Sequence, residues 1–160
     1  MVKLLVTVAV FGALIVLPVH AAPEAPWFGS WQLNPARTTS RAEPSPYRKV
    51  TIRIEPWRDG LKVTYDMVGV RGGVTHMEWT GAMDGRESAV QGVDYLMTNA
   101  YRRIDDRSYE ILVKMDGRPV ARAVATVPPD GTTLTVVTTE RDAQGRSSTT
   151  TAVYERRSEM

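Results

Sequence analysis

The sequence predicts an all-β protein, an up-and-down antiparallel β-barrel of about 8–10 strands, with a β-sandwich as the alternative. Most of the chain alternates apolar and polar side chains with a period of two. Turn-forming Asp-Gly pairs recur between the alternating runs, and no stretch has the pattern of an amphipathic helix. A long series of hairpins tends to curl, and closure into a barrel removes the exposed sheet edges.

The alternation begins near residue 27 and continues almost to the end of the chain. It is clearest in Val50–Glu55 and Leu61–Met67, and the last segments are rich in Thr and Val. β-branched and aromatic residues in this pattern are typical of half-buried strands. The predicted strands are, in order, Phe28–Leu33, Lys49–Glu55, Leu61–Val68, Val74–Thr80, Ser88–Val90, Leu96–Ile104, Ser108–Met115, Arg118–Thr126, Thr132–Glu140 and Ser147–Arg156.

The segments between these strands are short and carry turn residues. Glycine accepts a positive φ without a steric clash, which tight hairpins require. Residues 34–46 differ, because they contain three prolines and predict a long loop with at most one helical turn after Pro35. The four Asp-Gly pairs predicted to form turns are Asp59-Gly60, Asp84-Gly85, Asp116-Gly117 and Asp130-Gly131.

The N-terminus has the pattern of a secretory signal peptide. Lys3 precedes an apolar run that ends at Pro18, and small residues follow, with cleavage expected after Ala21. A membrane anchor is the alternative, but a spanning helix needs roughly 20 apolar residues and this run is shorter. We therefore expect a signal peptide over residues 1–21, a linker over 22–26, a barrel domain over 27–157, and a periplasmic or secreted location without stable membrane insertion.

Charge and composition argue against several functions. Without Lys3 the chain has 19 basic and 18 acidic residues, and the arginines are scattered, so no nucleic-acid partner is expected. Cysteine is absent, and His76 is the one histidine after residue 21. A transition-metal site, a cofactor site or a Ser–His or Cys–His nucleophile is therefore not predicted, and we expect no enzyme activity. The sequence indicates no particular protein partner.

Both ends of the predicted barrel resemble the calycin group, which contains the lipocalins and the fatty-acid-binding proteins. Gly29-Ser30-Trp31 is similar to the Gly-x-Trp motif of the first strand, and Thr150–Arg156 is similar to the closing strand of the fatty-acid-binding branch. The nearest similarity is to small exported bacterial lipocalin-like proteins. The resemblance implies that Trp31 packs across the closed end of the barrel beside Arg156 or Arg157, in a structural role.

The sequence departs from the fatty-acid-binding branch at two places. Residues 35–46 are too short and too rich in proline for the helix pair that covers the barrel in that branch. The Arg-x-Tyr motif that binds a carboxylate there is replaced by Ala152-Val153-Tyr154, so fatty-acid recognition does not carry over.

The strand alternation predicts an apolar interior with a few polar groups. Methionine and aromatic side chains form an adaptable lining, and a barrel of this size has room for a small ligand. We therefore expect an exported lipocalin-like protein that binds a small apolar or amphipathic molecule. The alternative is a structural or protein-interaction barrel with a packed interior. The expected ligand-binding residues are Tyr65, Met67, Met77, Trp79, Tyr109, Ile111, Val113, Met115 and Tyr154.

Overall fold

The computed structural model describes residues 24–40 and 47–158, so the predicted signal peptide lies outside the described residues. No helix in these residues is long and apolar enough to cross a membrane. The elements are β1 Gly29–Leu33, the 3₁₀ turn η1 Pro35–Arg37, β2 Thr39–Ser40, β3 Tyr47–Trp57, β4 Gly60–Gly69, β5 Val74–Gly81, β6 Asp84–Ala89, β7 Met97–Arg103, β8 Ser108–Met115, β9 Arg118–Thr126, β10 Thr133–Arg141 and β11 Ser147–Arg157.

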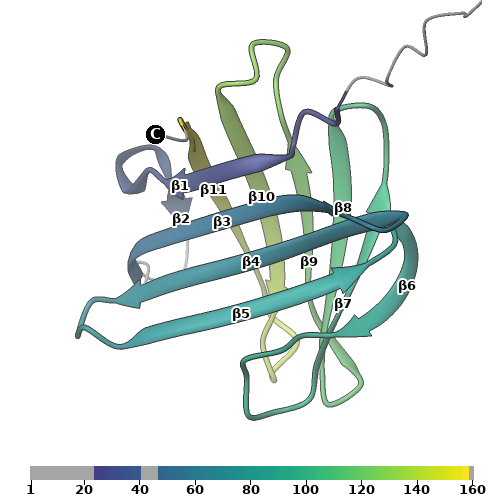
Figure 1. Ribbon diagram of the computed structural model, residues 1–160. Coiled ribbons are helices and arrows are strands. Elements are labelled where there is room, and N and C mark those ends of the chain that lie inside the picture. The colour runs from purple at the N-terminus through teal and green to yellow at the C-terminus, as the bar shows by residue number, and fades with distance from the viewer. Residues whose placement is uncertain (1–23, 41–46, 159–160) are drawn as a thin grey trace, which may run out of the picture.

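Ten antiparallel strands follow one another around a nearly closed barrel, which confirms the predicted up-and-down fold. The order is β5-β4-β3-β1-β11-β10-β9-β8-β7-β6, so the first and last long segments of the chain pair with each other. Figure 1 shows β3, β4 and β5 crossing in front of the steeper strands β7 to β10. The short strand β2 pairs with β11 outside this path.

The barrel has one weak seam, between β5 and β6. These strands share no ladder, and a single bridge joins Glu78 to Gln91 just after β6. The Glu78 backbone N–H donates to the Gln91 carbonyl at 3.0 Å, and the Gln91 N–H donates to the Glu78 carbonyl at 2.8 Å. The Trp79 indole adds side-chain bonds across the same seam, as its Nε1 donates to the carbonyls of Ser88 at 3.2 Å and Asn99 at 3.0 Å.

Two details differ from the sequence-based expectation. β2 is an additional strand inside the predicted loop, while the single helical turn after Pro35 forms as η1. Asp84-Gly85, predicted as a turn, lies within β6, which therefore begins earlier than the predicted Ser88. The register shifts between Asp84 and Glu87, and Gly85 has φ +84°, so the pair forms a bulge in the strand and not a hairpin.

One end of the barrel, which we call the closed end, is sealed by two tryptophans. Trp31 is fully buried, and its Nε1 donates to the Trp27 carbonyl at 2.9 Å. The Arg156 guanidinium lies 4.1 Å from the centroid of the Trp31 ring. It also donates to the carbonyls of Pro26, Phe28 and Gly131 at 2.7, 2.8 and 2.7 Å. The structure thus places Arg156, and not Arg157, over Trp31.

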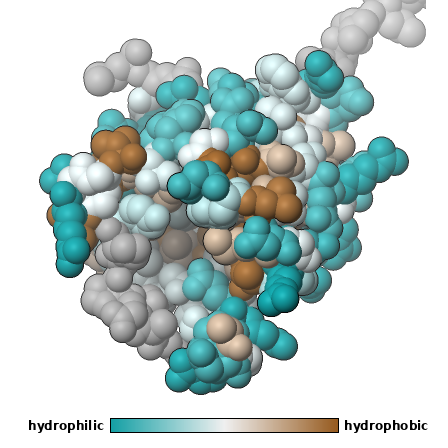
Figure 2. Space-filling view, turned by 90° about the horizontal axis from the view of Figure 1, so that it is seen from below, coloured by the Kyte–Doolittle hydropathy of each residue, from teal (hydrophilic) through white to brown (hydrophobic). Residues whose placement is uncertain are grey.

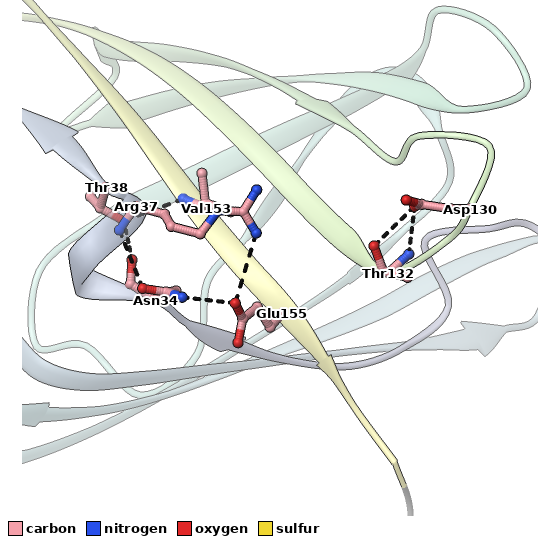
Figure 3. A network of polar contacts seen from close by, with 7 residues as sticks. All are labelled: Asn34, Arg37, Thr38, Asp130, Thr132, Val153 and Glu155. Atoms are coloured by element: carbon pink, nitrogen blue, oxygen red, sulfur yellow. Dashed lines mark hydrogen bonds and ion pairs between the residues drawn. The ribbon is translucent and has the colours of Figure 1, made fainter.

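The chain after β1 is held against β11 by polar contacts around Asn34 (Figure 3). The Asn34 side chain accepts from the Arg37 backbone N–H at 3.2 Å and donates to Glu155 at 2.7 Å. Arg37 lies 3.8 Å from the same Glu155 carboxylate, and the Val153 N–H donates to the Thr38 hydroxyl at 3.3 Å. These bonds supply hydrogen-bond partners for the residues that follow β1, and they hold η1 against β11.

Candidate ligand-binding site

The half of the barrel next to the closed end is filled with large side chains. Residues from strands on all sides of the barrel are at most 1% exposed there. They leave no room for a ligand, because side chains of this size and burial pack at the density of a protein core. These residues are Trp31, Ile54, Leu61, Val63, Trp79, Tyr101 and Leu134.

The opposite half, which we call the open half, has small side chains along one wall. Ala123 on β9 is part of the core and pairs with Thr138 on β10, which in turn pairs with Thr150 on β11. Directly paired residues of antiparallel strands face the same side of a sheet, so this row points inward. The neighbouring rows contribute Ala121 and Ala152 in the same way. Alanine and threonine fill little of the space that this wall encloses.

Several inward side chains of the open half are only partly buried. Tyr65 and Met77 on the facing strands, together with Thr138 and Ala152, have intermediate exposure although they point into the barrel. Solvent therefore reaches the interior from this end. Figure 2 shows the molecule from below, where the surface is hollowed near the centre and hydrophobic side chains lie around the hollow. The interior is packed at one end and open to solvent at the other, where we call the depression the hollow.

The predicted lining residues fall at three levels of this interior. Trp79 and Tyr109 lie in the packed half, and Met115 is 37% exposed, at the end of β8. Between these levels are Tyr65, Met67, Met77, Ile111, Val113 and Tyr154, all of which belong to the core or pack against it. Sequence reasoning missed Asn99 and Tyr101 on β7, as well as the small residues of the wall. The alternation along β7 already places Asn99 and Tyr101 on the inward face of the strand. Small residues have no such pattern that would mark them as part of a binding site.

A row of aromatic rings forms the floor of the hollow. The ring centroids of Trp79 and Tyr101 are 4.2 Å apart, and those of Tyr101 and Tyr109 are 5.7 Å apart. Tyr109 in turn makes an edge contact of 5.5 Å with Trp27 at the closed end. The row therefore connects the β5–β6 seam to the tryptophan seal and bounds the hollow on its inner side.

Four phenol groups lie in this interior. The hydroxyls of Tyr65 and Tyr101 are 3.3 Å apart. The Tyr109 and Tyr154 hydroxyls have no hydrogen-bond partner among the described residues, and the buried Asn99 Oδ1 also lacks one. Burial raises the pKa of all four tyrosines, most strongly those of Tyr101 and Tyr109, because the apolar surroundings disfavour the phenolate.

These phenols predict a stability that depends on alkaline pH. An unfolded tyrosine titrates near pH 10, whereas the raised pKa values of Tyr101 and Tyr109 keep them protonated in the folded state. Their contribution is fully present below about pH 9 and is lost as the pH rises above 10, because only the unfolded chain then releases these protons. Urea unfolding between pH 8 and 11, followed with absorbance at 295 nm, should show the buried phenols ionising together with unfolding. The double variant Tyr101→Phe/Tyr109→Phe should have a shallower pH dependence, and ionisation of all tyrosines near pH 10 without loss of structure would contradict the prediction.

Charged groups lie outside this interior. None of the buried residues in the described ranges is charged. His76, on the outer face of β5, is exposed, and its Nδ1 lies 2.7 Å from Asp66 Oδ1. The Asp105 carboxylate accepts from the Arg107 backbone N–H at 2.8 Å, which is a turn contact. No group of three potential metal ligands occurs in residues 24–40 and 47–158.

Two surface depressions flank Arg156 at the closed end. One is bordered by Phe28, Arg53 and Pro56, and the other by Arg107 and Pro129. Both are open to solvent, and both lie outside the barrel. Because the Arg156 guanidinium is already bonded to three backbone carbonyls, we assign this region a structural role.

Comparisons with known proteins identify the fold. No protein-family model matches the chain, and no curated protein matches it in sequence. Among solved structures, the chain is similar to the zebrafish ileal bile acid-binding protein in complex with cholic acid. The likeness covers 82% of this chain and 99% of that chain, with a TM-score of 0.50 and 12% sequence identity. The resemblance to the calycin group is thereby confirmed at the level of the fold.

Proposed function

We propose that this chain is an exported protein that holds a small apolar or amphipathic molecule in the open half of its barrel and catalyses no reaction. One observation carries the proposal: the inward side chains are fully buried in one half of the barrel, whereas in the other half one wall has small residues and several inward side chains, such as Tyr65 and Ala152, are partly exposed. Concave, mostly apolar sites with a few polar groups are typical of small-molecule binding.

The chemistry of the lining supports this choice. Met67 and Met77 supply flexible apolar surface on the strands opposite the small-residue wall, and Val113 and Ile111 add to it. Burying apolar ligand surface against these side chains favours binding by about 25 cal/mol per Å² of surface removed from water. The zebrafish protein of the same fold is complexed with cholic acid, an example of this barrel type with an amphipathic molecule. The signal-peptide pattern of residues 1–21 supports a periplasmic or secreted location.

Apolar side chains at the mouth of the open half support entry from this end. Exposed hydrophobic residues gather on the β4–β5 and β6–β7 connections and on the nearby strand ends (Figure 2). Clusters of this kind mark binding sites more often than plain surface does. This mouth comprises Val70, Val74, Tyr95, Leu96 and Met115, which are 37–75% exposed.

Filling the hollow tests the proposal directly. We expect Ala152→Phe to weaken binding of an apolar fluorescent probe such as pyrene about tenfold or more while changing the free energy of unfolding by less than about 1 kcal/mol, because the new ring occupies empty space. Ala89→Phe is the matched control, since Ala89 is exposed at the end of β6 and should leave binding unchanged. Fluorescence titration and urea unfolding give the two quantities.

The opposite pattern would support a packed interior. If wild-type protein bound no apolar probe and Ala152→Phe lowered the free energy of unfolding by about 1–3 kcal/mol, as overpacking of a core does, the proposed ligand site would not exist.

A further inference from the structure

Among the described residues, the polar groups around the hollow are neutral at physiological pH. They include the hydroxyls of Tyr65, Tyr101, Tyr109 and Tyr154, the amide of Asn99, and the hydroxyls of Thr138 and Thr150 on the small-residue wall. We propose that the ligand carries a neutral hydrogen-bonding group, such as a hydroxyl, ester or ketone, and that carboxylates are discriminated against. This inference rests on the proposed ligand-binding function and specifies the class of ligand.

Unpaired hydrogen-bonding groups indicate where the head group lies. Tyr109 is 3% exposed, yet its hydroxyl has no partner among the described residues, and the same holds for the Tyr154 hydroxyl. Asn99 is 5% exposed and its Oδ1 is unpaired. Buried polar groups are nearly always paired, so the enclosed Asn99 Oδ1 calls for a partner that the described residues do not supply, and the two phenol hydroxyls can bond the same ligand group. A phenol can donate and accept, which suits a hydroxyl or a carbonyl oxygen.

The distribution of charge argues against a carboxylate at this position. In the described part of the chain, the inward rows carry charge at the two ends of the barrel: at the exposed Arg118 and Glu140 near the mouth, and at Arg103 and Arg156 at the closed end. Arg103 and Arg156 are at the closed end, where Arg103 lies 5.6 Å from the Trp27 ring centroid and Arg156 bonds backbone carbonyls. A carboxylate deep enough to contact the phenols would lose its hydration without gaining a cation.

The raised pKa values of the interior tyrosines indicate that a negative charge is unfavourable here. Burial is the first cause of the raised pKa of Tyr65, Tyr101, Tyr109 and Tyr154, and ionising Tyr65 would raise the pKa of Tyr109 and Tyr154 further. The surroundings that disfavour a phenolate also disfavour a ligand carboxylate beside it.

A series of ligands with the same chain length tests the inference. Displacement of bound pyrene by 1-decanol, methyl decanoate and decanoate is measured at pH 8. We expect decanol and methyl decanoate to bind at least about tenfold more tightly than decanoate. The apparent affinity for decanoate should rise as the pH is lowered toward the pKa of its carboxyl group, while that for decanol stays constant. Decanoate binding as tightly as decanol at pH 8 would overturn the inference and leave the proposed function intact; failure of pyrene and of all three ligands to bind would overturn both.

Single-atom variants locate the head group. Tyr109→Phe and Tyr154→Phe each remove one hydroxyl, and we expect at least one of them to weaken decanol binding about three- to tenfold, the range for one net hydrogen bond. Pyrene has no polar group, so its affinity should not change. Thr139→Val is the control, because it removes a hydroxyl from the exposed outer face of β10 and should leave both affinities unchanged. An unchanged ratio of decanol to pyrene affinity in both inner variants would overturn the assignment of the phenols.

Discussion

Replacing Trp31 by Ala is expected to lower the free energy of unfolding by about 3–5 kcal/mol, the usual cost of removing a buried aromatic side chain. Trp31 is fully buried, its indole N–H donates to the Trp27 carbonyl, and its ring lies under the Arg156 guanidinium. The substitution therefore opens a cavity in the packed half and removes the contacts that hold the segment before β1 in place. Urea unfolding monitored by circular dichroism measures the loss.

Trp57→Ala is the matched control for this variant. Trp57 is 43% exposed at the end of β3, where Arg58 and Lys62 lie near its ring. Its truncation should change the free energy of unfolding by less than about 1 kcal/mol, as is usual for a surface residue. Equal losses for the two variants would mean that the closed end is no more tightly packed than the surface, contrary to the structure.

Trp79→Ala is expected to cost about 3–5 kcal/mol as well, and in addition to open the seam between β5 and β6. Trp79 is 1% exposed, and its indole is the side chain that bonds across this seam, to Ser88 and Asn99. Because only one backbone bridge joins these strands, the amides of Glu78 and Gln91 should lose hydrogen-exchange protection more than the amides of β3 and β4.

Trp79→Phe separates packing from hydrogen bonding at the same position. It keeps most of the ring volume but removes the N–H that bonds the Asn99 carbonyl at 3.0 Å, so we expect a smaller loss, about 1–3 kcal/mol, with the same local loss of protection. If exchange at Glu78 and Gln91 stayed unchanged in both variants, the indole would not be the contact that closes the barrel.

Local sequence patterns were sufficient to predict the ten strands of the barrel, though not β2 or the start of β6. Alternation in segments such as Leu61–Met67 reflects one buried and one solvated face, a property that each strand carries in its own residues. Turn chemistry is equally local: the Asp130 carboxylate accepts from the backbone N–H and the hydroxyl of Thr132, both at 3.0 Å (Figure 3). Asp84-Gly85 shows the limit, because a Gly with positive φ forms either a hairpin or a bulge, and the pairing with β7 decides which.

The candidate site was only partly predictable. Alternation indicates which residues point inward, so Tyr65, Met77 and Tyr154 were identified from their strands alone. It does not indicate which inward residues share a level of the barrel, because that depends on the register between strands distant in sequence. Met115 was therefore predicted in the lining although it is 37% exposed. Small residues such as Ala123 indicate a binding site only when the structure shows the space that they leave open.

The sequence by itself determined that the chain forms hairpins of half-buried strands and that no cysteine or second histidine after residue 21 is available for other chemistry. Only the tertiary structure decided that the barrel is packed around Trp31 and open to solvent beside Ala152, and that Tyr65 and Tyr101 bond each other while no buried residue in the described ranges is charged. The physical reason is that a strand pattern reports the two faces of one segment, whereas a cavity and its electrostatics arise from side chains that meet only when ten strands are paired in register.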